Sequence, residues 1–175
     1  MSSNTWDELA KRLDAVPKPV QELRLCPDPE VRDRYLTAKK DHEQADNYLK
    51  QMGKDADPEA LAHVQKEAQA AAEELAAAKS AYDKVTIVLK FKALPRGELE
   101  KLQNAHPAGE QDEAKGEDYA FETFAPALIS AASMNEMPVD YAAKALDQWA
   151  PGDARDLWNA AWSIQHARRT DLGKG

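Results

Sequence analysis

Two long stretches of the chain carry apolar or small side chains at alternating steps of three and four residues, the spacing of a heptad seam on an α-helix. The first stretch opens at Asp28-Pro29 and the second at Asp57-Pro58, each typical of a helix cap followed by a first-turn proline. The first seam consists of Val31, Tyr35, Ala38, His42, Ala45, Leu49 and Met52. The second consists of Leu61, Val64, Ala68, Ala71, Leu75, Ala78, Tyr82 and Val85.

The connection between the two stretches is short. It is centred on Lys54-Asp55 and follows Gly53, a residue type that commonly ends helices. Helices joined this closely fold back on one another, so residues 28–84 are predicted to form an antiparallel helical (coiled-coil) hairpin. Alanine is frequent in both seams and buries little area per layer. We therefore expect docking or homo-oligomerisation to add stability to the hairpin.

A strand is predicted directly after the hairpin, over residues 85–92. One face of this segment carries Val85, Ile87, Leu89 and Phe91, and the other carries Thr86, Val88, Lys90 and Lys92. A lone strand is unstable, so a partner is needed. The proline-bounded segment 20–26, which precedes the hairpin, is the expected partner.

The first 27 residues are predicted to form an N-terminal helix and this short strand. Thr5 and Glu8 have the spacing of a capping box, and Trp6 and Leu9 lie on one face of the helix that would follow. Pro17 is expected to stop it.

The last third of the chain, residues 85–175, is predicted to be the strand plus a helical domain. Helices are expected over 121–134 and 138–150, with a third from Gly152-Asp153 onward. The segment 108–118 is rich in acidic residues and is predicted to be a mobile, solvated loop. The fold class is therefore mainly α, a helical hairpin plus a small helical domain with one short two-stranded sheet.

Charge and cysteine content exclude several classes of function. The net charge is −8, which disfavours a nucleic-acid partner because phosphates require lysine and arginine clusters. Cys26 is the single cysteine, so neither an intrachain disulfide nor a multi-cysteine zinc site can form. No apolar run is long enough for a membrane span, and no signal-peptide pattern is present. A reducing, cytoplasmic environment is expected.

No set of residues has the spacing of a catalytic or metal site, so we expect no enzyme activity, cofactor or metal. His42 is expected to be a polar layer within the first seam, and His106 to end a helix before Pro107. Nothing near Cys26 in the sequence supplies a base that would activate a thiol. The acidic pairs are adjacent in sequence, whereas glycosidases require carboxylates opposed across a pocket.

Aromatic residues are concentrated near the C-terminal end, where three of the four tryptophans fall within residues 149–162. A helical core stripe is one interpretation, and Phe124 and Leu128 are expected to face a core. The alternative is a docking face, because tryptophan and tyrosine dominate binding hot spots. The candidate partner-binding residues are Phe121, Phe124, Leu128, Trp149, Leu157, Trp158 and Trp162.

The order of elements in residues 86–129 resembles the tail assembly chaperones of tailed phages that infect actinobacteria. The likeness extends more loosely from about Leu23 to Trp162, and the N-terminal helix departs from the family pattern. The residues that carry the resemblance are Phe91-Lys92-Ala93-Leu94-Pro95-Arg96, Leu102, His106-Pro107, Tyr119, Thr123-Phe124 and Ala127-Leu128-Ile129.

The resemblance implies a non-enzymatic protein of the host cytoplasm that binds the tape measure protein and helps recruit tail tube subunits. A coiled-coil structural adaptor, or a minor component of a phage tail or related injection apparatus, is the alternative. The family commonly makes a longer form by programmed frameshift. Leu172-Gly173-Lys174 is compatible with a slippery codon heptamer, so we expect a frameshift near this end.

Overall fold

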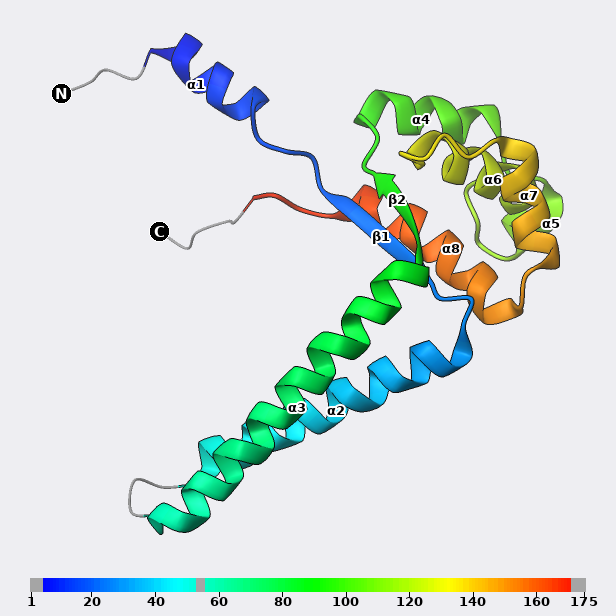
Figure 1. The fold of residues 1–175 in the computed structure, drawn as a ribbon. Helices are drawn as coiled ribbons and strands as arrows, with labels where there is room; N and C mark the ends of the chain where they lie inside the picture. Colours follow the sequence, from blue (N-terminus) through cyan, green and yellow to red (C-terminus); the bar gives the residue numbers. More distant parts are fainter. Residues whose placement is uncertain (1–4, 53–55, 171–175) are drawn as a thin grey trace. The chain divides into compact units, whose positions relative to one another are not determined.

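The computed structural model describes residues 5–52 and 56–170, and the described part is mainly helical with one small two-stranded antiparallel sheet (Figure 1). The predicted fold class is confirmed. The chain divides into two compact units, residues 24–88 and residues 1–23 with 89–175. Three expectations fall outside the described residues: the helix stop at Gly53, the connection at Lys54-Asp55 and the frameshift region at 171–175.

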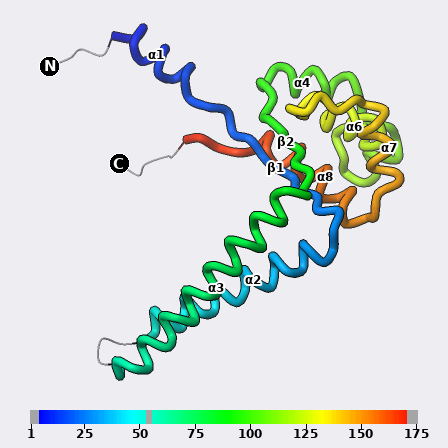
Figure 2. The backbone as a smooth tube through the Cα atoms, in the orientation of Figure 1, coloured from blue at the N-terminus to red at the C-terminus, as the bar shows by residue number. Residues whose placement is uncertain are grey.

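The unit of residues 24–88 is built on the predicted hairpin of α2 (Pro29–Gln51) and α3 (Pro58–Val85). The two helices lie side by side in Figure 2 and pack against each other. Both expected caps form. The Asp28 carboxylate accepts from the backbone N–H groups of Glu30 and Val31, and the Asp57 carboxylate accepts from that of Ala60. The most buried hairpin positions are seam residues, Ala38, Val64 and Ala78.

Contacts between side chains hold the two helices in register. The rings of Tyr35 and Tyr82 stack with their centroids 4.5 Å apart. The Arg34 guanidinium donates to both carboxylate oxygens of Glu74 at 2.8 and 3.1 Å. These contacts confirm that the heptad seams face one another.

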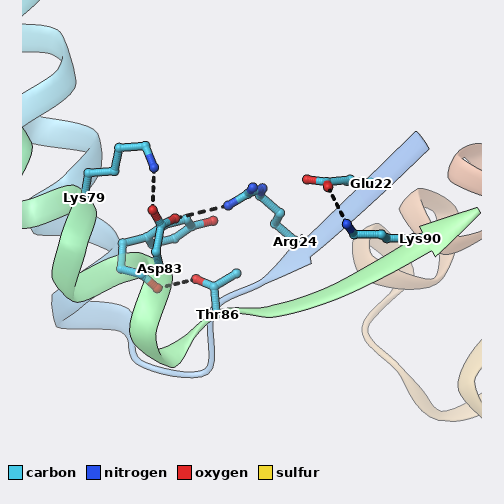
Figure 3. Close-up of polar contacts among 7 residues, drawn as sticks. Glu22, Arg24, Lys79, Asp83, Thr86 and Lys90 are labelled. Atoms are coloured by element: carbon cyan, nitrogen blue, oxygen red, sulfur yellow. Dashed lines mark hydrogen bonds and ion pairs between the residues drawn. The ribbon is translucent and has the colours of Figure 1, made fainter. Parts of the chain in front are cut away.

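The sheet pairs β1 (Val20–Leu25) with β2 (Ile87–Lys92), as the sequence predicts. The strand begins two residues later than expected, because α3 continues to Val85 and Thr86 then caps it in an extended conformation. The Thr86 hydroxyl donates to the Tyr82 carbonyl oxygen at 2.6 Å (Figure 3). Phe91 lies at the expected buried face, whereas Ile87 is 55% exposed.

Charged pairs flank each strand (Figure 3). The Lys90 ammonium lies 3.4 Å from the Glu22 carboxylate, across the sheet. The Asp83 carboxylate, near the end of α3, accepts from Arg24 at 3.2 Å and also from Lys79. All these side chains are substantially exposed, so each pair contributes little stability by itself.

The helical domain that follows the sheet contains α4 to α8 and a short 3₁₀ turn. Its elements are α4 (Arg96–Ala105), α5 (Glu110–Ala114), α6 (Phe121–Ala132), α7 (Val139–Gln148), α8 (Pro151–Ser163) and η1 (Ile164–His166). Phe91 of β2 belongs to the core that α6, α7 and α8 enclose. That core consists of Phe91, Ile129, Ala132, Met137, Ala142, Ala145, Leu157, Ala160, Ala161 and Ile164.

Two hydrogen bonds to the Lys90 backbone join the turn after α6 to strand β2. The Met134 N–H donates to the Lys90 carbonyl oxygen, and the Asn135 side-chain oxygen accepts from the Lys90 N–H, both at 2.8 Å. Ser133 is buried, and its hydroxyl oxygen accepts from the backbone N–H of Met137. Residues after the hairpin are therefore fixed to the core by backbone pairing as well as by Phe91.

The N-terminal helix differs from the expectation in its cap. α1 spans Trp6–Asp14, and the Thr5 side chain accepts no capping hydrogen bond from the described residues. The predicted capping box is therefore wrong. Trp6 is 71% exposed and Leu13 59%, so the apolar face of α1 is not buried against the described chain.

The acidic segment 108–118 holds more secondary structure than predicted. It contains α5, and the Gly109 N–H donates to the Asp112 carboxylate at 3.0 Å. The residues that bracket it form a bridge, Pro107 with Tyr119, and the Ala120 N–H donates to the His106 carbonyl oxygen at 2.9 Å. The prediction of a loop is therefore wrong over the short helix α5, whereas most residues of the segment are exposed, as expected of a solvated segment.

Candidate functional site

Aromatic side chains of α6, α8 and the segment before α6 form one continuous cluster in the helical domain. Trp158 and Trp162, one turn apart on α8, stack with their centroids 5.3 Å apart. Phe124 of α6 meets both indoles edge-on, at 6.2 and 6.1 Å. Phe121 meets Trp158 edge-on at 5.0 Å. We call this set, together with Tyr119, the aromatic cluster.

Burial divides the predicted binding residues into two groups. Phe124, Leu128 and Leu157 have no exposed surface, so they hold the core together and cannot contact a partner while the domain is folded. Phe121, Trp149, Trp158 and Trp162 are half-buried. Of the seven candidate residues, only these four half-buried ones have surface that a partner could contact.

Trp149 lies apart from the other half-buried aromatic residues. It follows α7, its backbone N–H donates to the Ala145 carbonyl oxygen at 3.0 Å, and it packs against the core. Phe121, Trp158 and Trp162 are instead joined by ring contacts within the aromatic cluster. These three side chains are the best candidates for a shared binding surface.

Three residues of the cluster's edge are not among the predicted binding residues. Tyr119 contacts Phe124 at 4.3 Å and Trp162 at 5.8 Å, and His166 contacts Trp162 edge-on at 4.7 Å. His106 lies 6.3 Å from Phe124, and its Nδ1 is within 2.9 Å of the Thr123 hydroxyl. His106 ends α4, as expected. His166 lies four residues after Trp162, in η1, so extending the helical pattern of α8 by one turn would have placed the two side chains together.

The electrostatic surroundings of Tyr119 are acidic. Burial raises the pKa of the Tyr119 phenol above its ordinary value, and the negative charges of Glu117 and Asp118 raise it further. The phenol therefore remains neutral to higher pH than a free tyrosine. An acidic border next to an apolar surface favours partners that carry positive charge.

Nothing in the described residues brings together a recognisable set of reacting groups. The described chain holds no group of three or more histidine, cysteine, aspartate or glutamate side chains that could bind a metal ion. The Cys26 thiol donates to the Asp28 carbonyl oxygen at 3.3 Å. His42 lies on the hairpin seam, as predicted, and its buried Nδ1 has no hydrogen-bond partner among the described residues.

Comparison with known proteins shows no family whose model matches this chain, and no curated protein or solved structure matches it significantly. Among the described helices, none combines the length and the apolar composition that crossing a bilayer requires. The site is therefore interpreted from its own residues.

Proposed function

We propose that this chain is a protein-binding assembly factor without enzymatic chemistry, and specifically a phage tail assembly chaperone. Its partners in this proposal are the tape measure protein, which it keeps soluble, and tail tube subunits, which it helps to recruit in the host cytoplasm. The sequence resemblance supplies the identity of these partners. The half-buried rings of Phe121, Trp158 and Trp162 in one cluster are the observation that supports binding.

The physical support is that large aromatic side chains in contact with one another give much binding area at low entropic cost. Trp158 and Trp162 are held by their stack and by the buried ring of Phe124, so few rotamers are lost when a partner covers them. A long helical cargo exposes apolar seams, and a surface of this kind can shield them from aggregation.

The direct test is co-expression with the tape measure protein, followed by measurement of the soluble cargo. Trp158→Ala and Trp162→Ala are expected to reduce soluble cargo, whereas Trp6→Ala provides a matched control because Trp6 is an exposed tryptophan outside the cluster. Circular dichroism first establishes that each variant is folded. Folded cluster variants that solubilise the cargo as well as the Trp6 variant does would remove the cluster from the site.

The frameshifted longer form is a separate part of this proposal. An extension on a minority of subunits would add a cargo-binding segment to a shared body. Expression with an out-of-frame tag after codon 175 tests it, and absence of a tagged product ends it.

The alternative is a coiled-coil structural adaptor or minor particle component, and the paired α2 and α3 helices suit it equally well. The two functions differ in whether the protein remains in the assembled particle. A chaperone is absent from the completed particle, whereas a structural component is retained, so mass spectrometry of purified particles distinguishes them.

A further inference from the structure

A small groove lies between α6 and α7 of the helical domain, beside the aromatic cluster. Its volume is about 280 Å³, and it is lined by Phe121, Glu122, Pro126, Ala143, Leu146 and Asp147. This volume is at the lower limit of small-molecule pockets, which hold roughly 300–1,000 Å³. A hollow of this size suits one long side chain.

Four of the six residues that line the groove are apolar. Pro126 is buried, and Phe121 is fixed by its edge-on contact with Trp158 at 5.0 Å. Ala143 and Leu146 line the groove from α7. One turn before Ala143 on the same helix, Val139 adds a further apolar side chain, which is 46% exposed. An apolar segment can therefore lie along α7 while one of its side chains enters the groove.

The polar groups of the groove are acceptors. Glu122 and Asp147 each bring a carboxylate, and neither is in an ion pair with another described residue. Pro126 lacks the backbone N–H that would donate to the Glu122 carbonyl oxygen one turn earlier, so this acceptor loses its helical donor. A set of acceptors with two negative charges requires a cationic donor.

We propose that the groove binds one lysine or arginine side chain carried on an apolar helical segment of a partner protein. The alkyl stem lies on Pro126 and Leu146, and the charged head donates to Glu122 and Asp147. The inference goes beyond the proposed function, because it depends on the chemistry of the groove alone and applies to any partner with such a segment.

The test uses a fluorescein-labelled helical peptide of alanine, glutamine and leucine with one central lysine, and a matched peptide with norleucine in place of lysine. Fluorescence anisotropy measures the affinity of the full chain for each. The lysine peptide is expected to bind roughly tenfold more tightly, a preference that added salt reduces. Glu122→Gln combined with Asp147→Asn is expected to abolish the preference.

Two further variants separate the groove from general acidity. Asp140→Asn makes the same chemical change on an exposed part of α7 outside the groove lining, and it should leave the preference intact. Ala143→Leu narrows the groove from an exposed position, so it should weaken binding of both peptides. Circular dichroism verifies the fold of every variant.

Several results would overturn the proposal: equal affinity for the two peptides, no measurable binding of either, or a preference that survives in the Glu122 and Asp147 double variant. Loss of the preference in Asp140→Asn would assign it to the net charge of the chain. The assay contains no tape measure protein, so its outcome is independent of the chaperone test.

Discussion

Replacing Ala78 by leucine should separate the two helices of the hairpin. Ala78 has no exposed surface and Ala38 only 4%. The stacked rings of Tyr35 and Tyr82 lie one turn away along each helix, so small residues and stacked rings together set the distance between the axes. A leucine at position 78 has no space unless the axes move or the rings separate.

The expected cost follows from overpacking of a close contact. Extra methylene groups in a well-packed site destabilise by about 1–3 kcal/mol. For an independently melting unit of roughly this size, each kcal/mol lowers the melting temperature by about 4–8 °C, so we expect a fall of roughly 4–24 °C.

Thermal melting followed by circular dichroism measures this effect, and Ala77→Leu is the matched control. Ala77 is adjacent in sequence and exposed, so the same substitution there should change stability by less than about 0.5 kcal/mol. If Ala78→Leu melts at or above the temperature of Ala77→Leu, the close approach of α2 and α3 at this layer is refuted.

Three further predictions concern other parts of the chain. Leu49→Asp and Leu75→Asp each place a charge on a seam and should cost about 2–4 kcal/mol; unchanged melting temperature and helicity in both would contradict packing through these seams. The Tyr119 phenol should titrate above its ordinary pKa in an ultraviolet absorbance titration, because burial disfavours its anion. Since its folded pKa exceeds the unfolded value, its contribution to stability is complete below the unfolded pKa and is lost as pH rises through the folded one. Deleting residues 109–116 should leave folding and cargo solubilisation nearly intact, because the Ala120 N–H already bonds to the His106 carbonyl oxygen across the excised segment; loss of soluble cargo in a folded deletion variant would show that the segment binds.

The hairpin was predictable because its signals are local. Asp28-Pro29 and Asp57-Pro58 each combine a side-chain cap with a pre-set first turn, and both caps form. The heptad period fixes which face of each helix is apolar, and two apolar faces on a short connection have few ways to pack. Strand β2 was located by its alternation of apolar and polar residues, and β1 by the need of a lone strand for a partner.

The order within 108–118 was not predictable from the charge pattern. Most residues of this acidic run are exposed, and in addition Asp112 accepts from the Gly109 backbone and the ends are joined at Pro107 and Tyr119. A bridge between residues twelve positions apart is a tertiary contact, which composition does not encode. Conversely, Thr5 and Glu8 have the spacing of a capping box, but the Thr5 side chain accepts no capping hydrogen bond from the described residues.

The division of the aromatic residues between core and surface also depends on tertiary packing. Leu157 and Trp158 are adjacent on α8, and one is fully buried while the other is half-buried. Leu157 belongs to the core that includes Phe91 and Ile129, whereas Trp158 contacts the rings of Phe121 and Phe124. The sequence therefore located the aromatic residues, but it could not tell which of the candidate binding residues are fully buried, as Phe124, Leu128 and Leu157 are.

Burial is distributed unequally between the two units, and this bears on how a partner would bind. In the hairpin the buried apolar side chains are small, Ala38, Val64 and Ala78, whereas the helical domain encloses Phe91 and Leu157 completely. Little area is gained where alanines meet, so helix propensity and the two aspartate caps must supply much of the hairpin's stability. The larger seam residues remain only half-covered by the opposite helix. A helix laid along them would bury area that the two-helix pair cannot bury by itself, so binding there would stabilise the hairpin in proportion to partner concentration.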